Sequence, residues 1–211
     1  MLGIQSSDER DGAEDLLFET NQGTNRARYH AAVESAAAVL WVFGAGGGLG
    51  GPAGGVYERL ARRLLPDTAS LQLDYRHPGH LVSCVADVLL GIEYLKLRGH
   101  NRVILVGHSF GGAVVLNATL ASMDVIAAAA LSSQAYGAGD VARISPRPLL
   151  FAYGEEDEVL PFTCSVTLFQ RAREPKILKL YPGCRHGLDD CREQLDHDLQ
   201  EWLSKVLASG A

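Results

Sequence analysis

The 211-residue sequence contains no apolar segment that approaches the ~18 residues of a membrane-spanning helix. Its N-terminus, MLGIQSSDERDGAED, lacks the basic and then apolar pattern of a secretory signal. Basic clusters are also missing beyond the pair Arg62-Arg63, and the formal net charge is -6, which argues against nucleic-acid binding as the main function. We therefore expect a cytoplasmic protein with no membrane insertion and no nucleic-acid partner.

Cysteine is scarce, and no two cysteines stand in the C-x-x-C spacing. The four thiols are Cys84, Cys164, Cys184 and Cys191. We expect all four to be free in a reducing compartment. A bridge between Cys184 and Cys191 is the less favoured alternative.

Apolar strands and helical segments alternate along the chain. The first two strands, within 16–21 and 27–34, alternate apolar and polar residues as half-buried antiparallel strands do. Segment 36–43 is a continuous apolar run, which is typical of a strand buried on both faces. Further strands are expected at 70–75, 102–107, 125–133, 147–154 and 176–183, and helices at 56–65, 80–98, 109–122, 160–172 and 188–207.

This order predicts an α/β fold with a mostly parallel central sheet, an N-terminal antiparallel hairpin and helices on both faces. The length and the hydrophobic fraction of 47% suit one domain over residues 1–211 with a single sizeable core. The polar lead-in, about residues 1–14, is expected to be a flexible N-terminal segment.

A glycine-flanked serine lies between one expected strand and the next expected helix. The pentapeptide Gly107-His108-Ser109-Phe110-Gly111 fits the pattern G-x-S-x-G, in which a sharp turn pushes the serine Oγ out of the sheet. Gly107 and Gly111 are needed because a side chain at either position would collide with the neighbouring strand or helix. A serine that merely caps the following helix is the alternative interpretation.

A serine hydroxyl becomes a good nucleophile only when a base removes its proton, and that base needs an acid to orient it. Candidates for both roles follow the ends of later strands, in the order acid and then histidine. The first of these strands is followed by Glu155, Glu156, Asp157 and Glu158, and the last strand is followed by His186. The order agrees with what a serine nucleophile on a parallel sheet requires.

Together these segments resemble the motifs of the α/β-hydrolases. Gly-Glu-Glu-Asp-Glu-Val-Leu-Pro is similar to that family's G-x-x-D-x-[IV]-[VL]-P acid loop, which implies that Asp157 is the catalytic acid. Gly-Cys-Arg-His-Gly resembles the family's histidine loop, which implies that His186 is the base. The resemblance extends from Val39 to the closing helix and implies a serine hydrolase with Ser109 as nucleophile. The glutamates beside the acid are then expected to form a solvated loop edge, and His108 to pack or to line the pocket.

The glycine-rich segment FGAGGGLGG, residues 43–51, has two interpretations. In an α/β-hydrolase it supplies one backbone N–H of the oxyanion hole, and the other comes from Phe110, just after the serine. The family usually begins this loop with His-Gly, where this sequence has Phe-Gly. Ala45 is the expected donor, and Gly46 is its competitor.

The other interpretation is a dinucleotide-binding loop. Gly46-x-Gly48-x-x-Gly51 matches G-x-G-x-x-G after a strand and before a helix, and Asp74 ends the next strand, where a ribose-binding acid would stand. The serine, acid and histidine segments favour the hydrolase, because a dinucleotide-binding protein has no need of them. A hydrolase-like fold kept as a non-catalytic binding protein is a third interpretation.

Many α/β-hydrolases insert a helical lid between the strand at 125–133 and the strand that precedes the acid. Here only QAYGAGDVARISP joins them, so no lid domain is expected. The resemblance then implies an open site, as in small esterases and dienelactone-hydrolase-like members, although the latter usually carry cysteine in place of Ser109. We expect a carboxylesterase for small-molecule esters with short or compact groups, with thioesters or small amides as alternatives. A monomer or weak homo-oligomer without metal or organic cofactor is expected.

Overall fold

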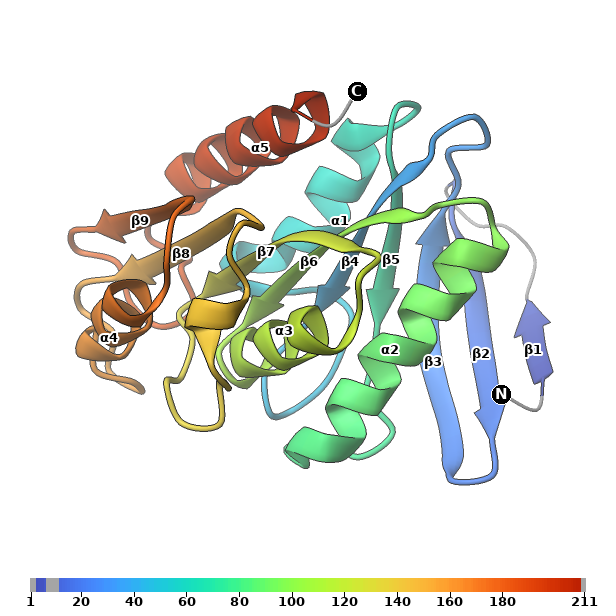
Figure 1. Ribbon diagram of the computed structural model, residues 1–211, viewed down its shortest axis with the longest axis horizontal. Coiled ribbons are helices and arrows are strands. Elements are labelled where there is room, and N and C mark those ends of the chain that lie inside the picture. The colour runs from blue at the N-terminus through green and yellow to red at the C-terminus, as the bar shows by residue number, and fades with distance from the viewer. Residues whose placement is uncertain (1–2, 7–11, 210–211) are drawn as a thin grey trace.

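The computed structural model describes residues 3–6 and 12–209 of the chain. Within these residues nine strands form one sheet in the order β1-β2-β3-β5-β4-β6-β7-β8-β9 (Figure 1). Helices cover both faces of the sheet (Figure 1). The predicted α/β fold with a mostly parallel sheet is confirmed.

The N-terminal end of the sheet is antiparallel. It consists of β1 (Gly3–Ser6), β2 (Glu14–Thr20) and β3 (Gly23–His30), of which the last two are the predicted hairpin. β3 also pairs antiparallel with β5 (Ala69–Leu73) and so joins the hairpin to the rest of the sheet. The predicted flexible segment, residues 1–14, lies partly outside the described residues, and in its described part β1 pairs with β2.

The rest of the sheet is parallel. Besides β5 it consists of β4 (Ala37–Val42), β6 (Arg102–His108), β7 (Val125–Leu131), β8 (Leu149–Gly154) and β9 (Lys176–Tyr181). Every residue of β4, β5 and β8 is buried, whereas the edge strand β9 is mostly half-buried. Because the strands are parallel, the loops that follow them meet at one edge of the sheet.

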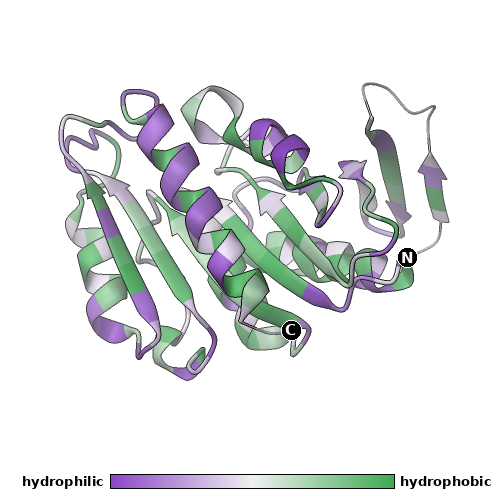
Figure 2. Cartoon of the chain, turned by 90° about the horizontal axis from the view of Figure 1, so that it is seen from above, coloured by the Kyte–Doolittle hydropathy of each residue, from purple (hydrophilic) through white to green (hydrophobic). Residues whose placement is uncertain are grey.

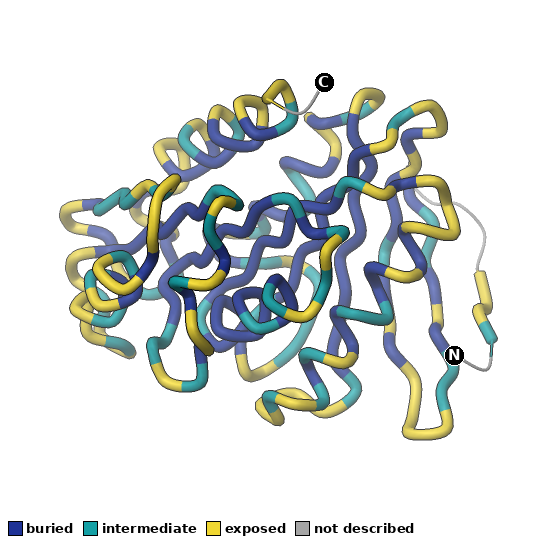
Figure 3. Tube along the Cα trace, in the orientation of Figure 1, coloured by how far each residue is buried: buried dark blue, intermediate teal, exposed yellow. Residues whose placement is uncertain are grey.

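Two helix layers cover the sheet. The helices are α1 (Pro52–Leu64), α2 (Leu81–Leu97), α3 (Phe110–Ala121), α4 (Thr163–Arg171) and α5 (Arg192–Ala208). α1 and α5 pack with Trp41 in one core cluster, and α2, α3 and α4 pack with Leu40 in the other, since successive strand residues face opposite sides. Green strands lie between helices with purple outer faces in Figure 2, and Figure 3 shows the same strands buried. In the described part of the chain, no helix combines the length and the apolarity needed to cross a bilayer.

Two connections depart from simple strand-helix links. The sequence predicts a helix from Val56, and the turn before it, 53–55, has left-handed backbone angles. This turn brings the Ala53 N–H to the carbonyl oxygen of Gly187, at 2.7 Å. The connector from β7 to β8, all of it described, contains one short 3-10 helix, η1 (Val141–Arg143), and no helical lid, as expected.

Candidate active site

Ser109 stands at the turn between β6 and α3, with backbone angles of φ 57° and ψ −121° that few non-glycine residues adopt. Its N–H donates to the Leu131 carbonyl at 2.8 Å, which fixes the turn against β7. The turn is possible only because its flanks lack side chains. A Cβ on Gly107 would overlap the backbone of Gly111, and a Cβ on Gly111 would overlap the Phe43 carbonyl. Ser109 itself is half-buried at the edge of the sheet.

The structure brings the side chains of Ser109, Asp157 and His186 together. His186 Nε2 lies 3.1 Å from Ser109 Oγ, and His186 Nδ1 lies 2.7 Å from Asp157 Oδ2. The other oxygen of Asp157 accepts hydrogen bonds from the N–H groups of Val159 at 2.8 Å and Leu160 at 2.7 Å. This carboxylate is fully buried and acts as acceptor, so Nδ1 carries the proton and the Nε2 lone pair faces the serine.

The three other acids of the loop after β8 are exposed, as expected for a solvated edge: they are Glu155, Glu156 and Glu158. Glu158 nevertheless has a specific contact: its Oε2 accepts a hydrogen bond from the His186 N–H at 3.1 Å. Hydrogen bonds from its own N–H and from that of His186 lower the pKa of Glu158. Sequence reasoning missed this contact, because the two residues meet only in the folded chain.

His108, which directly precedes Ser109, contacts the loop that carries His186. Its ring is buried, stacks on Phe43 at 5.3 Å between centroids and donates through Nε2 to the His186 carbonyl oxygen at 2.9 Å. Burial lowers the pKa of His108 to about 4, so the ring is neutral at pH 7. Its Nδ1 has no hydrogen-bond partner among the described residues. The expectation of a packing role holds, and the bond to His186 adds to it.

The glycine loop passes directly beside Ser109. A Cβ on Gly44 would lie 3.5 Å from the Ser109 Cβ, and Gly47 closes a turn by donating to the Gly44 carbonyl at 3.0 Å. The two residues between them, Ala45 and Gly46, are exposed. The N–H of Phe110, the first residue of α3, has no acceptor within its own helix. These three backbone groups are the expected oxyanion donors.

Asp74 has partners that a dinucleotide-binding site would not give it. Its carboxylate accepts hydrogen bonds from the Gly48 N–H and from Arg26, both at 2.6 Å. Both carboxylate oxygens thus have partners within the protein, and the Gly48 N–H is unavailable for a pyrophosphate.

One group of potential metal ligands occurs among the described residues, on α5 and away from the loops that carry Ser109 and His186. It consists of His197, Asp198 and Glu201. Asp198 already binds Lys179 and the Tyr181 hydroxyl, and Glu201 binds Lys205. Nothing in this group points to a resident ion.

The family model described as "Alpha/beta hydrolase family" matches residues 39–203. The chain belongs to this family. Among solved structures, Est1E from Butyrivibrio proteoclasticus superimposes with a TM-score of 0.76 at 17% identity, over 92% of this chain and 99% of that one. The esterase domain of a Rhodothermus marinus protein gives 0.70 at 19% identity, over 95% and 98% of the two chains. At these identities the similarity concerns the fold.

Curated relatives match shorter stretches. The uncharacterized protein YfhR of Escherichia coli (strain K12) is 33% identical over an alignment of 108 residues, and the match covers 40% of this chain and 38% of that protein. A carboxymethylenebutenolidase homolog of Mus musculus is 30% identical over an alignment of 133 residues, and the match covers 55% of this chain and 54% of that protein. The chain thus spans between 38% and 54% of the lengths of these two relatives.

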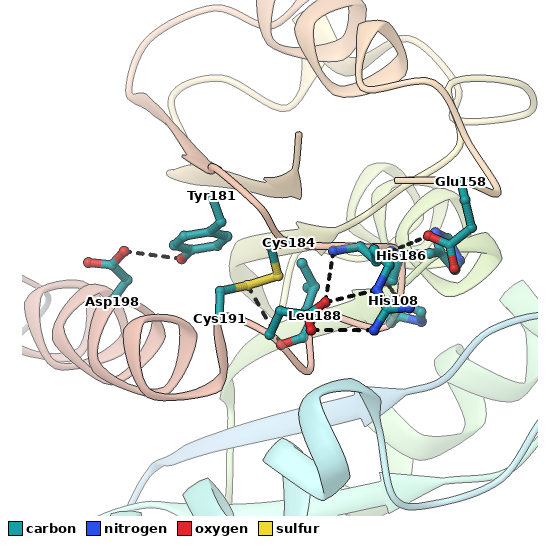
Figure 4. The surroundings of a disulfide bond; sticks show 10 residues. His108, Glu158, Tyr181, Cys184, His186, Leu188, Cys191 and Asp198 are labelled. Atoms are coloured by element: carbon teal, nitrogen blue, oxygen red, sulfur yellow. Dashed lines mark hydrogen bonds and ion pairs between the residues drawn. A yellow bond between two sulfur atoms is a disulfide. The ribbon is translucent and has the colours of Figure 1, made fainter. Parts of the chain in front are cut away.

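In this α/β-hydrolase a disulfide encloses the histidine loop, which corrects one expectation. Cys184 and Cys191 are bonded to each other, with Cα atoms 5.7 Å apart, and His186 lies between them in the loop (Figure 4). The prediction that both are free thiols is wrong, because the loop reverses direction and brings the two Cα atoms within bonding range. Cys84 and Cys164 are free, as predicted.

Proposed function

We propose that this α/β-hydrolase is a serine carboxylesterase that uses Ser109 as nucleophile, His186 as general base and Asp157 as the acid that orients it. The single observation that carries the proposal is the unbroken chain of hydrogen bonds from Asp157 Oδ2 through both ring nitrogens of His186 to Ser109 Oγ. A serine that only capped α3 would need neither partner, and its side chain makes no capping hydrogen bond.

The proposed reaction follows the order in which these groups are connected. Ser109 Oγ attacks the ester carbonyl while His186 Nε2 takes its proton, and the same nitrogen then protonates the departing alkoxide. Water then attacks the acyl-enzyme: His186 Nε2 takes the proton of the water and gives it to Ser109 Oγ, which leaves as the acid product is released. The negative oxygen of each tetrahedral intermediate is held by the Phe110 N–H and by an N–H of the glycine loop, from Ala45 or its neighbour Gly46.

Carboxylic esters are the proposed substrate class. The description of the Rhodothermus marinus structure, which shares this fold, as an esterase domain supports it, as does the name of the mouse relative. Thioesters and small amides are competing substrates for the same three side chains. A panel of matched ester, thioester and amide substrates with a common acyl group ranks the three classes directly.

Labelling with a fluorophosphonate probe tests the nucleophile. The wild-type protein is expected to react covalently at Ser109 and to hydrolyse p-nitrophenyl acetate. Ser109→Ala is expected to lose the label and to lower kcat by about 10⁴- to 10⁶-fold with an unchanged circular dichroism spectrum. A wild-type protein that is neither labelled nor active would instead support a non-catalytic binding role.

The absence of a helical lid from the β7–β8 connector predicts a preference for short acyl chains. Complete burial of each CH₂ contributes ~0.8 kcal/mol, but an open cleft gains little of it. We therefore expect kcat/KM for p-nitrophenyl esters to stop rising beyond a few acyl carbons, without activation above the micellar concentration. A steady rise to ten or more carbons would contradict the open site.

A further inference from the structure

Asp74 follows β5 directly, at the edge of the sheet where the glycine loop passes. Its main chain makes two hydrogen bonds to β3. The N–H donates to the Arg26 carbonyl at 2.8 Å, and the carbonyl oxygen accepts from the side-chain Nδ2 of Asn25 at 3.1 Å. Its side chain is only 11% exposed. The hairpin side of the sheet thus holds this residue in place whatever the glycine loop does.

The carboxylate of Asp74 points at the glycine loop. Oδ1 accepts from the Gly48 N–H at 2.6 Å and from the Tyr75 N–H at 2.9 Å, while Oδ2 accepts from Arg26 Nη2 at 2.6 Å. Hydrogen bonds to an ionised acceptor are short and strong. The fit is close as well, since a Cβ on Gly47 would lie 2.7 Å from Asp74 Oδ1.

The residues that Gly48 fixes lie immediately before it. The Gly44–Gly47 turn begins beside Ser109 at Gly44 and contains the expected donors Ala45 and Gly46, and glycine-rich backbone has many conformations open to it. Oxyanion donors stabilise a transition state only when they are held in place beforehand. An anchor at the far end of the turn removes much of that freedom.

We infer that Asp74 is a positioning residue, which anchors the glycine loop through the Gly48 N–H so that the loop's oxyanion donor faces the carbonyl oxygen of the ester that Ser109 attacks. The inference rests on the proposed function. It assigns to Asp74 a role in the acceleration of the chemical step, through the backbone of the glycine loop and without contact to the substrate.

Three variants separate this role from a merely structural one. Asp74→Ala removes the anchor, Asp74→Asn keeps an oxygen that accepts from Gly48, and Arg26→Gln removes the ion pair while leaving the anchor. Each is assayed for kcat and KM with p-nitrophenyl acetate and for inhibition by butylboronic acid, whose adduct with a serine resembles the tetrahedral intermediate.

Asp74→Ala is expected to lower kcat by about 10- to 100-fold with little change in KM, and to weaken boronate inhibition by a similar factor, since loss of one oxyanion donor costs about 10²- to 10³-fold. Asp74→Asn is expected to recover most of this loss, and Arg26→Gln to stay close to wild type. An unchanged kcat in Asp74→Ala, or a reduced kcat with unchanged boronate affinity, overturns the inference.

Gly47→Ala is the second route if Asp74→Ala does not fold. It leaves Asp74 intact and forces a methyl group against Oδ1 at a backbone φ of +70°, so the loop must shift. The same parallel loss in kcat and boronate affinity is expected, and wild-type values for both overturn the inference. A wild-type protein without Ser109-dependent hydrolysis refutes the proposed function instead, which keeps the two failures distinct.

Discussion

The serine elbow, which is the turn at residues 107–111, and the loop that carries His186 meet at the hydrogen bond between Ser109 and His186, but their conformations are stabilised in different ways. The elbow is packed backbone against backbone, and its closest neighbours are Gly111 and the main chain of Phe43. It follows β6, in which residues 103–108 are all buried, so no single side chain is responsible for its conformation.

The histidine loop, residues 182–191, has no regular structure and depends on individual ties. The His186 N–H donates to Glu158, the His186 carbonyl accepts from His108, and the disulfide closes the loop. The Ala53 N–H, from the start of α1, holds the next carbonyl oxygen. A rigid elbow thus presents the serine, whereas a few separable contacts aim the histidine. The contacts of the histidine loop can be removed one at a time.

The largest effect is expected from Asp157→Asn. The amide oxygen can keep the bonds from Val159 and Leu160, which places the amide NH₂ against His186 Nδ1. The ring then carries its proton on Nε2 and cannot accept one from Ser109, so kcat should fall by about 10⁴-fold. Steady-state kinetics with p-nitrophenyl acetate measures this.

Glu158→Gln is the matched control for that variant. It keeps an oxygen that can accept from the His186 N–H, and its kcat should stay within about threefold of wild type. The same holds for Glu155→Gln and Glu156→Gln. If Asp157→Asn were nearly neutral and one of the glutamine variants inactive, the catalytic acid would have to be reassigned.

A smaller effect is expected from the burial of His108 beside the histidine loop, and it depends on pH. Burial lowers the pKa of His108 to about 4, below the ordinary value of 6.5, so the unfolded chain binds a proton between these values and the folded chain does not. The contribution of His108 to the free energy of unfolding is therefore fully present above pH 6.5. It is lost as the pH falls toward 4, by up to about 3 kcal/mol.

Denaturant unfolding at pH 7 and pH 4.5 tests this with His108→Gln as partner. The amide of that variant can still donate to the His186 carbonyl, but it does not titrate. Burial lowers the pKa of His30 and His100 as well, so both proteins lose stability in acid, and the wild type should lose more. Equal losses of stability in the two proteins would show that His108 does not contribute to the pH dependence.

The smallest effect is expected from the disulfide. The loop that it closes has a sequence separation of only 7, and the chain-entropy relation gives about 2 kcal/mol of unfolding free energy for so short a loop. Cys184→Ala combined with Cys191→Ala should lower stability by that amount. A dithiol reductant should lower the wild-type value equally and leave the double variant unchanged, whereas a wild type insensitive to the reductant would contradict a stabilising contribution from the disulfide.

The sequence alone predicted the elbow well, because its cause is local. Backbone contacts within and beside one short turn require glycine at positions 107 and 111, so the pattern of glycines predicts the turn. The continuous apolar run of β4 likewise predicted a strand buried on both faces. The order of the acid and histidine segments predicted which side chains the structure brings to Ser109.

What only the tertiary structure decided are the ties between segments distant in the chain. The disulfide depends on a reversal of direction in the histidine loop, and the spacing of Cys184 and Cys191 does not encode it. The bond from His108 to His186 spans 78 positions, and the bond from Gly48 to Asp74 spans 26. Hydrogen bonds and cross-links act over a few ångströms, so such partners exist only once the strands that carry them lie side by side.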